Sequence, residues 1–134
     1  MGGVTRETQK LDMKDHDVIL QAIGEVRGDL METDWMLLVF EENAFVFSGK
    51  GSGGIKELQE TLKTTSVNYA LLRYTEQIDA SITVKFCLIK FQPENIRPSV
   101  RGKLGLLAGA VSALFEPVHK TIFVTDPSEM AENF

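Results

Sequence analysis

Residues Lys85–Asp126 read KFCLIKFQPENIRPSVRGKLGLLAGAVSALFEPVHKTIFVTD, and this segment is the most informative part of the chain. Apolar residues dominate both of its ends. Its middle combines a proline-bracketed loop with a long apolar run whose basic residues stand only at the start. This pattern predicts a strand, a loop, a helix and a second strand in succession. The predicted elements are a buried strand over Val84–Phe91, a loop from Pro93 to Pro98, a helix over Val100–Phe115 with Ser99 as its N-cap, and a strand over Thr121–Thr125.

The rest of the chain supplies further elements of the same kind. Helical spacing of apolar residues begins at Asp15, and two later apolar runs are joined by a short polar turn, as in a β-hairpin. The expected elements are a helix from Asp15 to Leu30, strands over Trp35–Phe40, Ala44–Ser48 and Val67–Thr75, a short helix containing Ile55, Leu58 and Leu62, a polar turn around Glu76–Ser81, and a final short helix opened by a capping box from Asp126 to Glu129.

These elements predict an α+β fold with a central mixed five-stranded sheet and helices on both of its faces. The length of 134 residues fits a single domain, and no repeat or long low-complexity linker divides it. We expect residues 1–12 to form a flexible N-terminal segment and residues 13–134 to form the domain.

The composition is that of an ordinary soluble protein, with 43% hydrophobic and 25% charged residues. No stretch approaches the roughly 20 apolar residues that a membrane-spanning helix requires. The single cysteine, Cys87, lies inside an apolar strand, so we expect a buried, reduced thiol in a cytosolic protein. We expect neither a nucleic-acid partner nor stable association with a membrane.

No group of residues indicates catalysis. The glycine-rich sequence Gly49–Gly54 lies between a predicted strand and a predicted helix, where phosphate-binding loops occur. Lys50, however, is followed by Gly51 rather than by the serine or threonine of a P-loop, which favours a flexible turn. His16 and His119 have no cysteine or acidic residue at metal-ligand spacing. We therefore expect no metal, no cofactor and no enzymatic activity.

The long helix has two unlike faces. One is a continuous apolar stripe that should face the core, made of Val100, Leu104, Leu107, Val111, Leu114 and Phe115. The opposite face should be polar if it meets only water, but it carries small residues and one leucine: Gly102, Gly105, Leu106, Gly109, Ser112 and Ala113. Three interior glycines cost roughly 1 kcal/mol each relative to alanine. Close approach of a partner, cover by the chain's own termini, and glycines without a role are the three explanations.

Charge is distributed unevenly between this segment and the rest of the chain. Residues 85–103 carry five basic residues and one acidic residue, a net charge of +4, whereas the whole chain carries −5. Arg101 and Lys103 stand at the start of the helix, where the helix dipole disfavours positive charge, so they do not serve to offset it. A cationic segment on an acidic body indicates a docking site for a negatively charged partner.

Residues 85–126 resemble the actin-depolymerising-factor homology family, and within it the coactosins. The resemblance rests on KFCLIKFQPENIRPSVRGK and KTIFVTD, with weaker similarity over about residues 15–130. It implies a cytoplasmic, cytoskeleton-associated protein that binds actin, filaments in preference to monomers, and modulates filament dynamics without catalysis. In this family the long helix inserts between actin subdomains. The residues that the resemblance, together with the helix pattern, assigns to actin binding are Lys85, Arg97, Arg101, Lys103 and Leu106.

A second hypothesis remains open. The glycine-rich face of the helix is also compatible with an assembly module that pairs with itself or with a protein other than actin. The actin-binding hypothesis predicts a monomer, whereas self-association predicts a stable dimer that a charge at Gly105 would disrupt.

Overall fold

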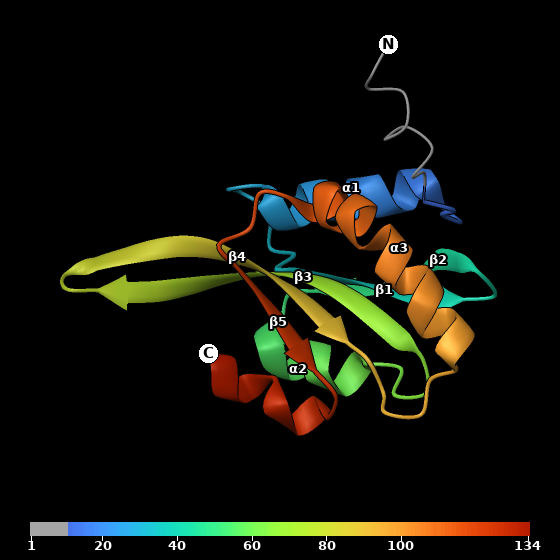
Figure 1. Cartoon of the computed structure of the whole chain (residues 1–134). Coiled ribbons are helices and arrows are strands. Elements are labelled where there is room, and N and C mark those ends of the chain that lie inside the picture. Colours follow the sequence, from blue (N-terminus) through green and yellow to red (C-terminus); the bar gives the residue numbers. More distant parts are fainter. Residues whose placement is uncertain (1–10) are drawn as a thin grey trace, which may run out of the picture.

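The computed structural model describes residues 11–134, which form a five-stranded sheet in the order β2-β1-β3-β4-β5 (Figure 1). Neighbouring strands are antiparallel except β4 and β5, which are parallel, so the predicted mixed sheet is confirmed. The strands are β1 (Trp35–Glu41), β2 (Ala44–Gly51), β3 (Val67–Ile78), β4 (Ser81–Phe91) and β5 (Lys120–Val124).

Helices cover both faces of the sheet, as the α+β prediction requires (Figure 1). The helices α1 (His16–Arg27) and α3 (Pro98–Phe115) lie on one face, where Leu38, Tyr69 and Leu88 belong to the core. The other face carries α2 (Gly54–Thr61) and two short 3₁₀ helices, η2 (Pro127–Glu129) and η3 (Ala131–Asn133). Strand residues alternate between the two cores, so the central strands are buried on both sides.

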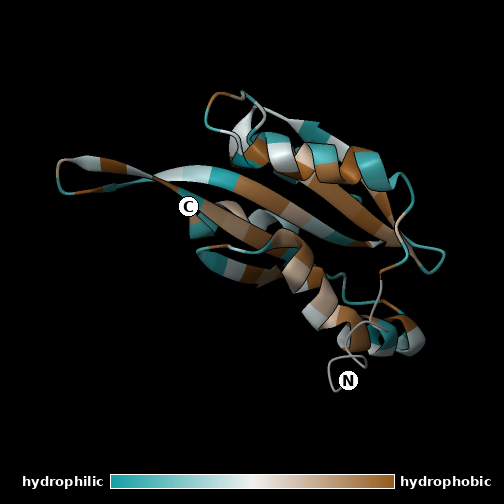
Figure 2. Cartoon of the chain, turned by 90° about the horizontal axis from the view of Figure 1, so that it is seen from above, coloured by the Kyte–Doolittle hydropathy of each residue, from teal (hydrophilic) through white to brown (hydrophobic). Residues whose placement is uncertain are grey.

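The strands β3 and β4 continue beyond the body of the sheet as a two-stranded hairpin, which we call the arm (residues 73–86; Figure 1, Figure 2). β1 pairs with β3 only up to Leu72, and β5 pairs with β4 only from Cys87. The predicted turn around Glu76–Ser81 is therefore wrong in extent. The chain reverses at Asp79, whose φ of 56° is the left-handed conformation that a two-residue hairpin turn requires.

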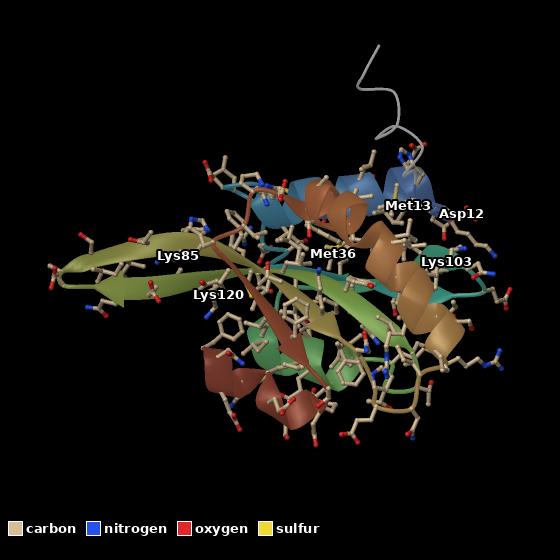
Figure 3. The ribbon with its side chains drawn as sticks, viewed as in Figure 1. Asp12, Met13, Met36, Lys85, Lys103 and Lys120 are labelled. Carbon is tan, nitrogen blue, oxygen red and sulfur yellow. The ribbon has the colours of Figure 1, made fainter. Side chains whose placement is uncertain are left out.

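The beginning of the described chain lies along β2 (Figure 3). Phe45 donates its backbone N–H to the carbonyl oxygen of Asp12 at 2.7 Å, and Lys14 donates to that of Phe45 at 2.9 Å. Met13 thereby covers part of the outer edge of the sheet. Of the flexible segment predicted for residues 1–12, the first ten residues lie outside the described part of the chain.

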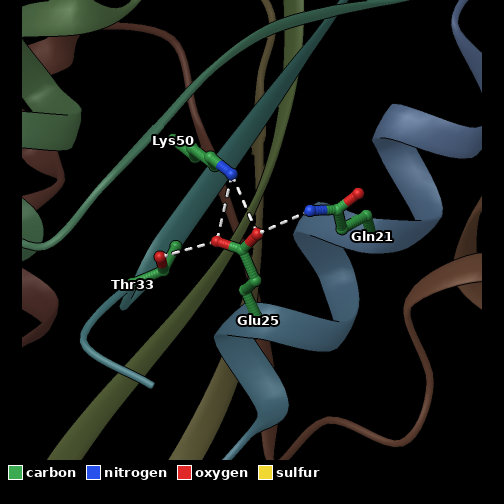
Figure 4. A network of polar contacts seen from close by, with 4 residues as sticks. All are labelled: Gln21, Glu25, Thr33 and Lys50. Atoms are coloured by element: carbon green, nitrogen blue, oxygen red, sulfur yellow. Dashed lines mark hydrogen bonds and ion pairs between the residues drawn. The ribbon is translucent and has the colours of Figure 1, made fainter.

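Residues Gly49–Gly51 belong to β2, so the predicted glycine-rich loop is shorter than expected. Glycine is needed at position 51 because Trp35 lies across it: a Cβ at Gly51 would come within 2.7 Å of the indole ring. Lys50 is not available to a phosphate, since its ammonium group contacts the Glu25 carboxylate at 2.9 Å (Figure 4). This hydrogen bond lowers the pKa of Glu25.

The start of α3 also differs from the prediction. The helix begins at Pro98, with Arg97 as the N-cap, rather than at Val100 with Ser99 as the cap. Proline suits the first helical position because its fixed φ is already helical and its missing N–H would have no partner there. The end at Phe115 is as predicted. The capping box between Asp126 and Glu129 is also confirmed, and it opens η2.

Acid is expected to destabilise the contact between α2 and β1. The Glu57 carboxylate accepts hydrogen bonds from the Trp35 indole at 2.8 Å and from the Gly53 N–H at 2.9 Å. The Gly53 and Trp35 hydrogen bonds lower the pKa of Glu57 below its ordinary value of 4.5. A lowered folded-state pKa means that this stabilisation is present above pH 4.5 and is lost as the pH falls through the folded-state value.

The measurement is a series of melting curves between pH 7 and pH 3, followed by fluorescence of Trp35, the only tryptophan. Glu57→Gln should lower Tm at pH 7, and the decrease of Tm between pH 7 and pH 3 should be smaller than in the wild type. Glu60→Gln, at an exposed position of the same helix, is the matched control and should behave as the wild type. Identical acid profiles for Glu57→Gln and the wild type would contradict this role.

Candidate functional site

The outward face of α3 carries a glycine ridge, by which we mean residues Gly102, Gly105, Leu106 and Gly109. All four are exposed, and Leu106 is 76% exposed. In residues 11–134, and apart from the helix's own backbone, no atom would lie within 4 Å of a Cβ built at any of the three glycines. Packing within the described chain therefore gives no reason for glycine at these positions.

The inward face of α3 holds the helix to the sheet. Leu104, Val111 and Phe115 are buried, and Val100, Leu107 and Leu114 pack beside them as partly buried residues. The predicted core stripe is thus confirmed. Cover of the opposite face by the C-terminal segment is excluded, because η3 lies on the other side of the sheet (Figure 1). In Figure 2, α3 is coloured white to brown over most of its length, whereas α1 alternates between teal and brown.

Three predicted site residues, Arg97, Arg101 and Lys103, gather at the start of α3. All three side chains are exposed, and none makes a hydrogen bond, ion pair or cation–π contact within residues 11–134. Their charges therefore lie beside the glycine ridge without an internal counter-ion. Since exposed guanidinium and ammonium groups form their strongest hydrogen bonds with carboxylates and phosphates, this end of the ridge favours an anionic partner.

Lys85, the remaining predicted site residue, lies elsewhere. It is on the arm, well separated from Lys103 on α3 (Figure 3). Its ammonium group contacts the Glu76 carboxylate at 2.5 Å across the hairpin. This hydrogen bond raises the pKa of Lys85 and lowers that of Glu76. The predicted residues are therefore divided: three of the five lie in α3 and Arg97 is its N-cap, whereas Lys85 is paired on a second element.

Two residues that the sequence did not single out adjoin the ridge. Phe123 is on the edge strand β5 and is 75% exposed, although its apolar strand suggested burial. The ammonium group of Lys90 lies 5.2 Å from the centre of the Phe123 ring. The parallel pairing of β4 and β5 places these two residues opposite each other, and no pattern in the sequence indicated that pairing. Together they extend the exposed surface from α3 onto the sheet.

His119 and Cys87 are two groups that could carry chemistry, and the first is hydrogen-bonded while the second is buried. His119 accepts a hydrogen bond at Nδ1 from the Phe86 N–H at 3.0 Å. Cys87 is fully buried, and burial raises the pKa of its thiol to about 11, so thiolate is scarce at neutral pH. Within residues 11–134, no three His, Cys, Asp or Glu side chains are grouped so as to hold a metal ion. None of the described helices is long and apolar enough to cross a membrane.

Comparison with known proteins identifies the family. The sequence profile of a family described as cofilin/tropomyosin-type actin-binding protein matches residues 12–134. Coactosin of Dictyostelium discoideum is 30% identical over 113 residues, which cover 83% of this chain and 77% of that protein.

Solved structures share the fold. Coactosin from Entamoeba histolytica has a TM-score of 0.81 at 24% identity, over 93% of this chain and 91% of that chain. Mouse coactosin, described as an actin filament binding protein, has a TM-score of 0.73 at 21% identity, over 92% of this chain and 86% of that chain. The chain therefore belongs to the cofilin family of actin-binding proteins, the actin-depolymerising-factor homology family, as a coactosin-like member.

Proposed function

We propose that this protein binds actin filaments in preference to monomers, through the glycine ridge and the cations at the start of α3, and modulates filament dynamics. The family consists of binding proteins rather than enzymes. The observation that carries the proposal is the exposed glycine ridge, because no atom of the described chain outside the helix backbone would contact a Cβ at its three glycines. A helix that tolerates about 1 kcal/mol per glycine without an internal reason is suited to close approach by another surface.

Electrostatics supports the same surface. Arg97, Arg101 and Lys103 are exposed and make no side-chain contact with an acid in residues 11–134, on a protein whose net charge is −5. Such unpaired cations favour a partner that presents acidic side chains. Free cations beside an apolar ridge would steer its approach and fix the register of binding. Mouse coactosin, which shares the fold, is described as a filament binder.

The arm would provide a second contact through Lys85. Because Glu76 holds this ammonium group in the free protein, an actin carboxylate must compete with Glu76 for it. Lys85 would then contribute more to specificity than to affinity. We propose that the protein acts as a monomer in the cytoplasm, associated with the cytoskeleton, and needs no cofactor.

Filament co-sedimentation tests this function. The wild type should pellet with filaments at low salt and less at high salt, since the screening length falls from about 10 Å at 0.1 M to about 3 Å at 1 M. Arg101→Ala/Lys103→Ala should weaken binding about tenfold, equivalent to roughly 0.7 kcal/mol for each exposed cation. The preference for filaments is tested separately, by measuring the affinity for monomeric actin in solution under conditions that prevent polymerisation, and this affinity should be lower than that for filaments.

The matched control is Lys14→Ala/Lys56→Ala, which removes two exposed cations that lie outside α3 and changes the net charge equally. Equal weakening by both double variants would show a general charge effect and would remove the start of α3 from the site.

Gel filtration of the wild type tests the second hypothesis, self-association. A stable dimer that Gly105→Lys converts to a monomer would favour self-association over actin binding.

A further inference from the structure

A groove separates α3 from the edge strand β5, because the helix does not extend over the last strand of the sheet. Its volume is about 360 Å³, within the range of protein pockets that hold a side chain or small ligand. Leu104, Ala108 and Phe123 contribute apolar walls, and Gly105 of the glycine ridge forms part of the rim. The groove is therefore continuous with the surface proposed to meet actin.

Two cations line this groove, Lys90 from the sheet and Arg101 from the helix, beside apolar residues and the uncharged polar residues Gln92 and Thr125. Lys90 is half-buried, and burial lowers the pKa of its ammonium group. Within residues 11–134 the ammonium group makes no hydrogen bond or ion pair. It makes a cation–π contact with Phe123, at 5.2 Å from the ring centre. Since a half-buried ammonium group is costly unless paired, the groove lacks the anion that these cations favour.

The described part of the chain, residues 11–134, does not supply this anion. None of the described residues that line the groove is acidic. The C-terminal 3₁₀ helices, which carry Glu129 and Glu132, lie on the opposite face of the sheet. Residues 1–10, outside the described structure, contain two basic residues and one acidic residue, so they bring no net negative charge. Charge complementarity therefore points to a partner.

We propose that the groove between α3 and β5 receives a segment of the actin surface in which a carboxylate side chain stands beside an apolar one. The carboxylate would pair with Lys90 and Arg101, and the apolar side chain would pack on Phe123 and Leu104. This proposal rests on the proposed function and adds the chemistry of the partner. Lys90, which the sequence did not assign to actin binding, would then contact the filament.

A small probe tests the chemistry of the groove without actin. 3-Phenylpropionate combines a carboxylate with an aromatic ring, and 3-phenylpropanamide is its neutral counterpart. We expect the acid to shift the NMR resonances of Lys90, Arg101 and Phe123 at concentrations on the order of millimolar. The amide should bind several-fold more weakly. Lys90→Met should narrow the difference between the two probes, and Lys90→Met/Arg101→Ala should abolish it. Equal shifts by acid and amide in the wild type would overturn the charge recognition.

Co-sedimentation tests the groove in the complex. Lys90→Met keeps the length of the side chain and removes its charge, and we expect about tenfold weaker binding to filaments with a Tm equal to or above that of the wild type. The matched control, Lys56→Met on the opposite face of the sheet, should bind as the wild type. If the wild type binds filaments and Lys90→Met binds equally well, the groove proposal fails while the proposed function stands. If the wild type does not bind filaments, both fail.

Discussion

A variant with alanine at Gly102, Gly105 and Gly109 is expected to be more stable than the wild type and a weaker filament binder. Glycine costs about 1 kcal/mol relative to alanine in a helix interior, so three replacements should add roughly 2–3 kcal/mol to the free energy of unfolding. No steric penalty opposes this gain, because each added methyl group would meet no atom of the described chain within 4 Å, the helix backbone aside. Chemical denaturation measures this effect directly.

The same three methyl groups should weaken binding if actin approaches the helix backbone closely. A gap of about 0.5–1 Å already forfeits a quarter to a half of the dispersion energy of each contact. Summed over the ridge, we expect about tenfold weaker binding or more in co-sedimentation. Gain of stability with loss of binding is the expected signature of a surface kept for function rather than for folding.

Gly24 provides the matched control for this variant. It lies inside α1, it is exposed, and a Cβ there would also meet nothing within 4 Å. Gly24→Ala should therefore raise stability by about 1 kcal/mol and leave filament binding unchanged. If the triple variant gained stability and bound filaments as tightly as the wild type, the glycines would have no part in binding. Without any gain in stability, the argument from helix propensity would itself be wrong.

The sequence predicted the body of the fold because burial and periodicity agree there. Residues such as Leu37, Leu71 and Leu88 are fully buried, and alternation along each strand divides the side chains between the two cores. The final capping box was predicted from local residue types alone, and Asp126 and Glu129 form it as expected. Local chemistry and tertiary packing thus favour the same structure in these elements.

The arm could not be predicted in this way, because its residues do not follow the rule that apolar side chains are buried. Ile82 is 71% exposed and Val84 is 50% exposed, although both lie in a strand. Polar residues such as Glu76 occur as readily in an exposed two-stranded hairpin as in a turn. The Lys85–Glu76 ion pair depends on the register of that hairpin, which was not apparent from the residue types.

The groove depends on where α3 lies over the sheet, which no local pattern specifies. The apolar spacing of the helix predicted which side faces inward, and Val111 and Phe115 are buried accordingly. It did not predict that the helix stops short of β5 and leaves Phe123 exposed. The candidate residues at the start of α3 were predictable because they are neighbours along one helix. Lys90 and Phe123 come from two separate strands.

Exchanging a residue on the inner or the outer face of α3 should separate folding from binding. Phe115 is fully buried in the core between α3 and the sheet, so Phe115→Ala should lower the free energy of unfolding by about 3–5 kcal/mol. That is a large share of the roughly 5–15 kcal/mol that stabilises a typical domain. Leu106→Ala removes a side chain that is 76% exposed, and should change stability by no more than about 0.5 kcal/mol.

Filament binding should show the opposite order. An exposed leucine that becomes buried at the centre of an interface acts as an anchor, so Leu106→Ala should weaken binding by about tenfold or more. Phe115→Ala, measured at a temperature where it remains folded, should bind almost as the wild type because Phe115 is not on the surface. Unchanged binding by Leu106→Ala would mean that the apolar part of the ridge does not contact actin. Binding would then rest on the cations of α3 alone, and it should disappear almost completely at high salt.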